Sequence, residues 1–530
     1  MAKTAKLPDI PAEERTPVVV QLLETVHYQM EMIQILRDEI AVLKGNKARP
    51  NIKAGKMDKG SKEKRDKKPK EDKRPGSSKK NKTVQLTIHE KVSIAPENIP
   101  EGSTFKGYKD FTVQGLIIEP HNICYLLERW ERPDGSYVEG KLPPSVHGHF
   151  TSTLTSHILY QYYQCHVTQP LLLEQLEEIG IQISSGQINR ILVEGHDSFH
   201  KEKDSVLVTG LQISSYINVD DTGARHDGEN GVCTHIGNEL FAWFESTEFK
   251  SRINFLSLLR AGQKDYHLIP EALEYMKLQK LPNTALLLLE KDENKIFTNK
   301  EEWENHLQGL GITQKRHIQI ATEGALLGSI LEHGFNPNMV IMSDDAGQFA
   351  ITLLLHALCW IHAERTIRKI VPFTDEQRSA LETIRDRIWK LYAALKLYKE
   401  NPTLKMKIEL ESRFDEIFQE KTCFITLNLA LKRLYNNKSE LLLVLDRPDI
   451  PLHNNGSETD IREYVKRRKM SGSTRSSPGR KCRDTFTSLK KTCRKLGVSF
   501  WKFLNDRVGR INSIPQLEYL MRVKSLTSTY

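Results

Sequence analysis

The hydrophobic pattern near the start of the chain predicts one long helix with a narrow apolar face. Apolar residues recur in steps of three and four, with Gln29 as the single polar member: Val19, Leu22, Val26, Ile33, Leu36, Ile40 and Leu43. This is the spacing of a coiled-coil seam, and Gly45 and Pro50 end it. We predict a coiled-coil helix over residues 1–46 that joins copies of the chain into a homo-oligomer. The alternative is a helix packed on the body of its own chain.

The pattern then passes from polar to β-type. Residues 47–84 have almost no large apolar side chains and predict a disordered linker. Short apolar runs at 83–88, 116–118 and 123–127, with the turn Pro133-Asp134-Gly135, predict a small β-rich module over residues 85–145.

Residues 146–205 have a helical pattern. One helix ends near Gly180, and a cap at Ser184 and Ser185 opens a second helix. This arrangement resembles a helix-turn-helix, whose second helix enters the major groove of DNA. The candidate base-reading residues are Gln187, Asn189 and Arg190. The alternative is an ordinary packing hairpin with no role in DNA binding.

From residue 206 onward the pattern predicts an α/β fold. Strands are expected at 215–219, 231–236 and 239–245, a helix at 250–260 and a further strand at 339–342. The first strand leads into Asp220-Asp221 and the last into Ser343-Asp344-Asp345. Three consecutive strands, the first delivering an acid, predict a ribonuclease-H-like core whose first part spans residues 206–350.

A third acid, Glu458, follows an Asn454-Asn455 pair that caps a helix. Between Asp345 and Glu458 lie 112 residues, far more than such a core needs. The helical pattern of residues 351–450 predicts an all-α insertion, which either covers the site and holds DNA or acts as a passive buttress. Residues 451–530 are expected to hold the last core helix and a basic C-terminal region.

The charge is concentrated in two segments. The chain has a formal net charge of +9, yet residues 47–82 hold 16 Lys/Arg against 5 Asp/Glu, and residues 461–510 hold 16 against 3. The remainder is therefore acidic. Concentrated cationic segments indicate a polyanionic partner, which here is DNA. For the first segment a solubilising linker is the alternative. In the second we expect phosphate contacts from Arg462, Lys466, Arg467, Arg468, Lys469 and Arg475.

Asp220, Asp344 and Glu458 suit metal-dependent chemistry on a phosphodiester. Such chemistry uses two metal ions to bind phosphate oxygens and to activate the attacking oxygen. Magnesium takes oxygen ligands, typically one or two carboxylates together with substrate phosphate. Each acid alone is more often a cap or a solvated residue. The ordered set of two strand-end acids, a helix-start acid and a basic tract favours a site with two Mg²⁺ or Mn²⁺ ions.

These motifs resemble the transposases of the insertion sequence 66 family. The residues that carry the resemblance are Asp220-Asp221-Thr222, Ser343-Asp344-Asp345, the segment from Cys359 to Arg365 (CWIHAER), and the segment from Asn454 to Arg462 (NNGSETDIR) followed by Lys469. The resemblance covers most of the chain. It implies a DNA transposase with an Asp-Asp-Glu triad at Asp220, Asp344 and Glu458 that binds these metal ions, acts on element ends and target DNA, and in many elements works with small accessory proteins.

The sequence also departs from the family pattern. Members often carry a Cys-rich zinc module before the core, but residues 85–140 hold only Cys124, so no structural zinc is expected there. Thr459 stands where an Arg commonly follows the Glu. The doublets Asp220/Asp221 and Asp344/Asp345 leave the choice of ligand open within each pair. Cys359 and His362 lack a second Cys/His pair, so they are expected to pack near the site and not to bind a metal.

Seven scattered cysteines and an apolar stretch too short for a membrane span predict a cytosolic protein without a membrane partner. The resemblance adds the expectation that the protein is bacterial and nucleoid-associated. Two other functions are alternatives to a transposase. One is a catalytically inactive transposase-derived DNA-binding protein, and the other is a structural protein of nuclease fold in a larger assembly.

Overall fold

A computed structural model of the chain describes residues 11, 16–43, 87–143 and 148–527. They belong to two compact units: Pro50–Glu119 is one, and Met1–Arg49 with Pro120–Tyr530 is the other. The predicted linker, residues 47–84, lies outside the described residues. In the part of the chain that the structure describes, no helix is long and apolar enough to cross a membrane.

The predicted β-rich module at 85–145 is only partly present. Its described strands are β1 (Arg129–Glu131) and β2 (Tyr137–Glu139), which pair around the turn at Pro133-Asp134-Gly135. The runs at 116–118 and 123–127 contain no strand, and their apolar side chains are exposed. The prediction fails there because a short apolar run forms a strand only where another strand pairs with it.

A five-stranded mixed sheet is the centre of the larger unit, with the strand order β5-β4-β3-β8-β9. Its strands are β3 (Tyr216–His226), β4 (Glu229–Gly237), β5 (Ala242–Thr247), β8 (Val340–Ser343) and β9 (Leu355–Leu358). The first three form an antiparallel meander, whereas β8 and β9 run parallel to β3. The fold is thus mixed α/β. Strand β9 lies inside the segment 351–450, which was predicted to be all-helical. That prediction is wrong at β9 because a short apolar run in the sequence does not distinguish a buried strand from a buried helix.

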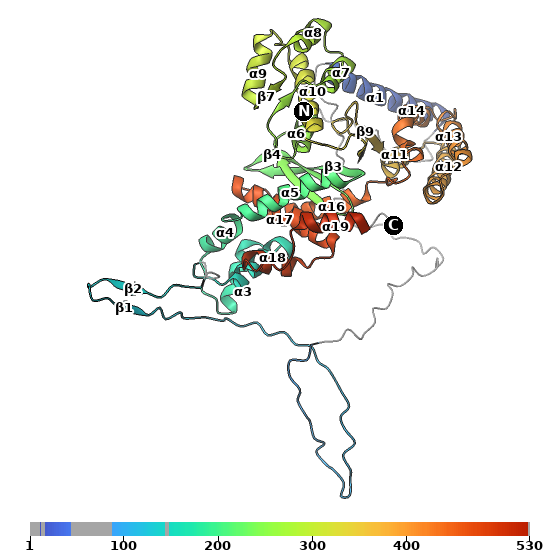
Figure 1. The fold of residues 1–530 in the computed structure, drawn as a ribbon. Helices are drawn as coiled ribbons and strands as arrows, with labels where there is room; N and C mark the ends of the chain where they lie inside the picture. Colours follow the sequence, from blue (N-terminus) through green and yellow to red (C-terminus); the bar gives the residue numbers. More distant parts are fainter. Residues whose placement is uncertain (1–10, 12–15, 44–86, 144–147, 528–530) are drawn as a thin grey trace. The chain divides into compact units, whose positions relative to one another are not determined.

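Alternate residues of the strands face opposite sides of the sheet, and buried residues pack on both sides. Ile217 and Val219 of β3 pack with α5 (Asp197–Ile213), α6 (Arg252–Leu259) and α10 (Lys315–Glu332). Val340 and Met342 of β8 face the insertion, and Phe244 of β5 faces α16 (Asn455–Ser471). Figure 1 shows strands β3 and β4 between α6 and α10 on one side and α16 and α17 (Ser477–Leu496) on the other.

A second helical block lies within the predicted core segment 206–350 and was not anticipated. Between α6 and α10 the chain forms β6 (Tyr266–His267), α7 (Pro270–Leu278), α8 (Asn283–Lys291), β7 (Ile296–Phe297) and α9 (Lys300–Gly309). Strands β6 and β7 pair as a separate two-stranded sheet. Packing of α10 against α6, α7 and β6 joins this block to the core.

The insertion after β9 is helical and has its own core. It contains α11 (Trp360–Arg368), α12 (Asp375–Glu400), α13 (Leu404–Phe418), α14 (Ile425–Asn436), α15 (Lys438–Leu441) and the short 3₁₀ turn η4 (Leu443–Leu445). Trp360 and Phe414 are buried at the centre of this core. The sheet is preceded by α2 (Ser152–Leu159), the π-helical turn η3 (Tyr160–Gln164), α3 (Gln169–Glu178) and α4 (Ser185–Val193).

The N-terminal helix α1 (Pro17–Leu43) contacts the insertion of its own chain. Leu23 is buried, and Glu24 Oε1 accepts a hydrogen bond of 2.6 Å from Gln377 Nε2. The predicted seam residues Leu22, Val26, Ile33 and Leu36 are exposed. Helix α1 therefore packs on its own chain through a face beside the seam and leaves these four seam residues uncovered, while Val19 is half-buried.

Helix α17 (Ser477–Leu496) seals the outer edge of the sheet, and α18 (Phe500–Val508) and α19 (Leu517–Thr527) follow it. The backbone N–H groups of Ala242, Phe244 and Ser246 on β5 donate to side chains of α17. Their acceptors are Thr492 Oγ1 at 3.2 Å, Ser488 Oγ at 2.9 Å and Asp484 Oδ2 at 2.8 Å. These acceptors are four residues apart and so share one face of the helix. They satisfy strand groups that would otherwise be buried without a partner.

We predict that Ser488→Ala destabilises the protein, because it leaves the buried N–H of Phe244 without its acceptor. Such an orphaned group costs about 1–3 kcal/mol. Urea denaturation followed by circular dichroism should show a lower midpoint for this variant. Ser412→Ala, at an exposed position in the middle of α13, is the matched control and should leave the midpoint unchanged. Equal midpoints for Ser488→Ala and the parent protein would contradict the edge-sealing role.

Candidate active site

Asp220 and Asp344 come from neighbouring parallel strands. The register pairs Asn218 of β3 with Met342 of β8, so each acid lies two residues beyond this pair at the same end of the sheet. Because side chains alternate along a strand, Asp220 shares the face of Asn218, and Asp344, directly after β8, continues the face of Met342. That is the face on which α16 and the insertion pack. The two carboxyl groups therefore meet beneath α16.

The electrostatics of Asp220 reflect this proximity. Burial raises the pKa of its carboxyl group from 3.8 to about 7, and repulsion from Asp344 adds to the increase. A hydrogen bond of 2.8 Å from the backbone N–H of Asp221 to Asp220 Oδ1 acts in the opposite direction. A half-buried carboxyl group facing a second one is poorly stabilised as an anion unless a cation lies between them.

The second acid of each doublet is engaged elsewhere. Asp221 accepts hydrogen bonds from Thr234 Oγ1 at 2.6 Å and Gln348 Nε2 at 3.0 Å, and Lys250 Nζ lies 3.7 Å from Asp221 Oδ2. Asp345 is exposed and pairs with Arg433 of α14 at 2.7 Å. By contrast, Asp344 Oδ1 is buried and accepts no hydrogen bond from any described residue. An acceptor without a partner at this point suits an oxygen ligand for a cation.

Asn454 fixes the start of α16 against β3. Its side chain was expected to cap the helix, but it makes no capping hydrogen bond. Instead, Asn454 Nδ2 donates to the carbonyl oxygen of Val219 at 2.9 Å, directly before Asp220. Its backbone N–H donates to Cys359 Sγ at 3.2 Å. On the next turn Ser457 Oγ and His235 Nδ1 are 2.7 Å apart. These buried contacts place the first turn of α16, which carries Glu458, beside Asp220.

Glu458 lies among cationic side chains of α11 and α16. Its Oε1 is 3.3 Å from Arg365 Nη2 and 3.5 Å from His362 Nε2, and its Oε2 is 3.5 Å from Arg462 Nη2. Burial lowers the pKa of His362, and Arg365 lowers it further, whereas Asp344 and Glu458 act to raise it. Both Asp344 and Glu458 are thus close enough to His362 to affect its pKa. The structure brings all three predicted acids to one side of the sheet, with His362 next to Glu458.

The predicted phosphate-binding residues divide into two groups. Arg462, Lys466, Lys469 and Arg475 are exposed. Arg467 is buried: its guanidinium lies 3.7 Å from the centre of the Tyr162 ring and donates to the carbonyl oxygen of that residue. Arg468 donates to Thr222 Oγ1 at 3.4 Å and to the carbonyl oxygen of Gly223. Both side chains hold α16 to the rest of the fold, and phosphate contact by Arg467 and Arg468 stays a prediction.

The helical hairpin at residues 169–193 forms as the pattern predicts. Ser184 caps α4 through a hydrogen bond to the N–H of Gln187. Asn189 and Arg190 are exposed, Gln187 is half-buried, and Asn189 Oδ1 accepts a hydrogen bond of 3.2 Å from Gln169 Nε2. The exposed pair is accessible to a partner. Both alternatives, DNA reading and simple packing, stay open.

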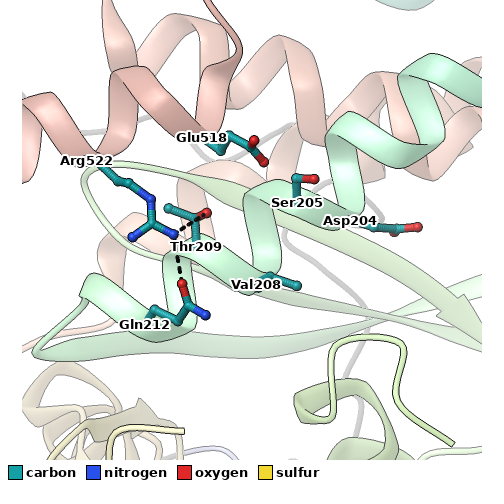
Figure 2. Close-up of a pocket in the computed structure, with 7 residues that line it drawn as sticks. All are labelled: Asp204, Ser205, Val208, Thr209, Gln212, Glu518 and Arg522. Atoms are coloured by element: carbon teal, nitrogen blue, oxygen red, sulfur yellow. Dashed lines mark hydrogen bonds between the residues drawn. The ribbon is translucent and has the colours of Figure 1, made fainter. Parts of the chain in front are cut away.

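A hollow between α5 and α19 contains none of the predicted site residues. Figure 2 shows Arg522 of α19 reaching across it to Thr209 and Gln212 of α5, with Glu518 one turn away. The hydrogen bonds of Arg522 are 3.4 Å to Thr209 Oγ1 and 2.8 Å to Gln212 Oε1. The guanidinium is thus used within the protein.

Comparisons with known proteins identify a matching family and a relative. The family described as "Transposase IS66 family" matches residues 312–481. An uncharacterized protein, y4jO of Sinorhizobium fredii (strain NBRC 101917 / NGR234), is 43% identical over 306 residues, which cover 57% of this chain and 95% of that relative.

The chain belongs to the transposase IS66 family. The family match includes Asp344, His362 and Glu458 together with the cationic residues of α16, whereas Asp220 lies before it. Membership supports a transposase role for this IS66-family chain, in agreement with the resemblance seen in the sequence.

Several residues of the site were not predicted from the sequence of this IS66-family chain. Gln348 and Lys250, the partners of Asp221, lie in unremarkable loop sequence. Asn454 was noted as a cap, but its contact with Val219 depends on strand and helix meeting across 235 residues of chain. The complete burial of Asn454 shows its importance for the site, and burial is known only from the folded structure.

We predict that Asn454→Ala lowers both stability and activity. It removes the donor to the Val219 carbonyl group, at a cost of about 1–3 kcal/mol, and loosens the first turn of α16. Thermal unfolding and a DNA strand-transfer assay measure the two effects. Asn455→Ala at the exposed neighbouring position is the matched control and should resemble the parent in both assays. A loss of the same size in Asn455→Ala would show that the position of Asn454 has no special importance.

Proposed function

We propose that this chain is a DNA transposase that cuts and joins DNA at the ends of its mobile element, with Asp220, Asp344 and Glu458 as its catalytic, metal-binding triad. Family membership supports the transposase role. The observation that carries the proposed site is the meeting of Asp220 and Asp344 on one face of the sheet, under the helix that carries Glu458.

A ribonuclease-H-like core is part of this proposal. It is supported by the sheet order, in which an antiparallel meander of β5, β4 and β3 is extended by the parallel strands β8 and β9. The first acid lies on the central strand β3 and the second directly follows the adjacent strand β8. The helical insertion after β9 and the block between α6 and α10 leave this order intact.

The carboxylates fit hard divalent cations such as Mg²⁺ or Mn²⁺. Asp344 Oδ1 is buried with no hydrogen-bond donor among the described residues, and the pKa of Asp220 is raised by burial and by repulsion from Asp344. Asp220, Asp344 and Glu458 would hold two ions. When bound, such ions activate the attacking oxygen and stabilise the leaving oxygen of a phosphodiester. In the proposed reaction a water oxygen bonds to phosphorus as the bond to the 3′ oxygen breaks. The freed 3′-hydroxyl then bonds to the phosphorus of a target phosphodiester as the target's own bond to its 3′ oxygen breaks, which leaves a 3′-hydroxyl on the target strand.

The surrounding residues of the chain orient the triad and the DNA. His362 and Arg365 hold the carboxylate of Glu458 from the side of α11. The exposed cations Arg462, Lys466, Lys469 and Arg475 suit contacts with the DNA backbone next to the cleaved bond. Arg462 lies one turn from Glu458 on the same helix, so a phosphate held by Arg462 lies close to the acids.

Assembly through α1 is the further part of the proposal. The described seam residues Leu22, Val26, Ile33 and Leu36 are exposed at heptad spacing. Pairing of this seam with a second copy buries them, and the contact of Leu23 and Glu24 with the insertion stays available beside it. A dimer brings two active sites to two element ends.

We predict that Asp344→Asn reduces transposition at least about 100-fold, because one of the proposed metal ligands is lost. A plasmid that carries the gene with its flanking DNA is the donor, and joined products are counted after incubation with Mg²⁺ and a target plasmid. Asp345→Asn is the matched control, since the side chain of Asp345 pairs with Arg433 on the surface. If both variants act like the parent, the proposed site is wrong. If the parent binds DNA but joins none, the inactive DNA-binding alternative holds.

We also predict that millimolar Mg²⁺ or Mn²⁺ raises the thermal midpoint of the parent protein in the absence of DNA. A cation between Asp220 and Asp344 relieves their repulsion in the folded state, and binding to the folded state alone stabilises it. Removal by a chelator should reverse the shift. Asp344→Asn should lose the shift, while Asp345→Asn should keep it. An equal shift in all three proteins would place the effect at some other site.

A further inference from the structure

A second set of metal-type side chains lies in the block between α6 and α10. Asp265 directly precedes β6, His267 ends β6, and His333 directly follows α10. Asp265 Oδ2 is 2.9 Å from His267 Nε2 and 2.6 Å from His333 Nε2. Among the residues that the structure describes, this is the cluster in which at least three His, Cys, Asp or Glu ligand atoms converge within 4.8 Å of one another.

The rest of the fold holds these three side chains together. Ser329 Oγ, one turn before His333, donates to Asp265 Oδ1 at 2.7 Å and leaves Oδ2 directed at the two imidazoles. Arg260 donates to the backbone carbonyl oxygen of Asp265 at 2.8 Å. Helix α10 approaches β6 so closely that a Cβ on Gly328 would lie 2.2 Å from the carbonyl oxygen of His267. The cluster is therefore built by the packing of α10 on β6, not by chance contact of surface side chains.

The chemistry of the three donors selects a class of ion. Two imidazole nitrogens and one carboxylate oxygen suit zinc and similar first-row transition metals, whereas magnesium prefers an all-oxygen set. In a tetrahedral zinc site with bonds of about 2.0–2.1 Å, neighbouring ligand atoms are about 3.3 Å apart. The nitrogen-to-oxygen distances here need to open by only about 0.5 Å to admit an ion.

The cluster is open to solvent on one side, where a fourth ligand could reach a bound ion. The side chain of His267 is 8% exposed and that of Asp265 22%, whereas that of His333 is 35% exposed. His333 also lines a hollow beside Leu259, Arg260 and Phe335. An ion held by the three side chains would therefore be reached by water from the side of His333.

We propose that Asp265, His267 and His333 bind one divalent transition-metal ion of the zinc class, with water as the fourth ligand. The ion joins β6 to the end of α10, a few residues before β8. It is separate from the proposed Asp220, Asp344 and Glu458 site, which takes magnesium-type ions. Without an ion, Asp265 Oδ2 accepts hydrogen bonds from His267 Nε2 and His333 Nε2. When the ion binds, each of these nitrogens gives up its proton and bonds to the metal in place of the hydrogen bond.

The test measures zinc uptake by the full chain. The purified protein is stripped with a chelator, kept in millimolar Mg²⁺ to occupy the carboxylate site, and titrated with Zn²⁺ against a chromophoric chelator. We expect the parent to bind one more zinc ion than His333→Gln, with the affinity of that site reduced at least about 100-fold in the variant. Zinc should also raise the thermal midpoint of the parent and not that of the variant.

His306→Gln is the matched control. His306 is in the same helical block and its Nε2 lies 3.0 Å from Asp292 Oδ2, but no third ligand of this kind joins that pair in the described part of the chain. This variant should bind zinc like the parent, and circular dichroism checks the folding of each protein. Asp265→Asn should lose the ion as His333→Gln does. The proposal is overturned if His333→Gln binds zinc as the parent does, or if His306→Gln loses as much zinc as His333→Gln.

Discussion

The burial of Asn454 is the constraint on which the arrangement of the three acids depends. Its side chain is fully buried between β3 and the start of α11. The side-chain Nδ2 donates to the carbonyl oxygen of Val219 and the backbone N–H donates to the sulfur of Cys359, whereas Oδ1 has no hydrogen-bond partner among the described residues. Val219 precedes Asp220, Cys359 precedes the helix of His362, and Glu458 lies four residues after Asn454. One residue therefore ties three distant segments together.

The interior cations explain why the basic C-terminal segment is not one continuous DNA-binding surface. Lys490 pairs with Glu463, and Lys491 and Lys495 both pair with Asp460, in contacts of 2.9–3.2 Å. These pairs join α17 to α16 and hold the helix of Glu458 in place. Buried cations that lack a carboxylate partner are costly, so the acids of α16 and the cations of α17 stabilise each other. The charge count in the sequence included all of them as if they were exposed.

Local periodicity was enough to predict the strands β3, β4, β5 and β8 and most of the helical insertion, whereas the roles of the three acids stay a proposal. It failed where structure depends on distant partners. Leu355–Leu358 becomes a strand because β8 lies beside it, and the runs at 116–118 and 123–127 do not because no described strand pairs with them. The contacts of Asp484, Ser488 and Thr492 with β5 could not be predicted either, since these residues in a helix give no sign of a sheet edge 238–250 residues away in the sequence.

The two acid doublets show how tertiary structure divides roles between adjacent residues. Asp220 and Asp221 point to opposite faces of β3, and the sequence does not say which face α16 covers. In the fold Asp220 faces Asp344, while Asp221 binds Gln348, which lies four residues after Asp344. The second acid of the first doublet thus anchors the loop that carries the first acid of the second doublet. Both residues of Asp220-Asp221 are needed for the proposed site, one as a metal ligand and one to position the loop of the other ligand.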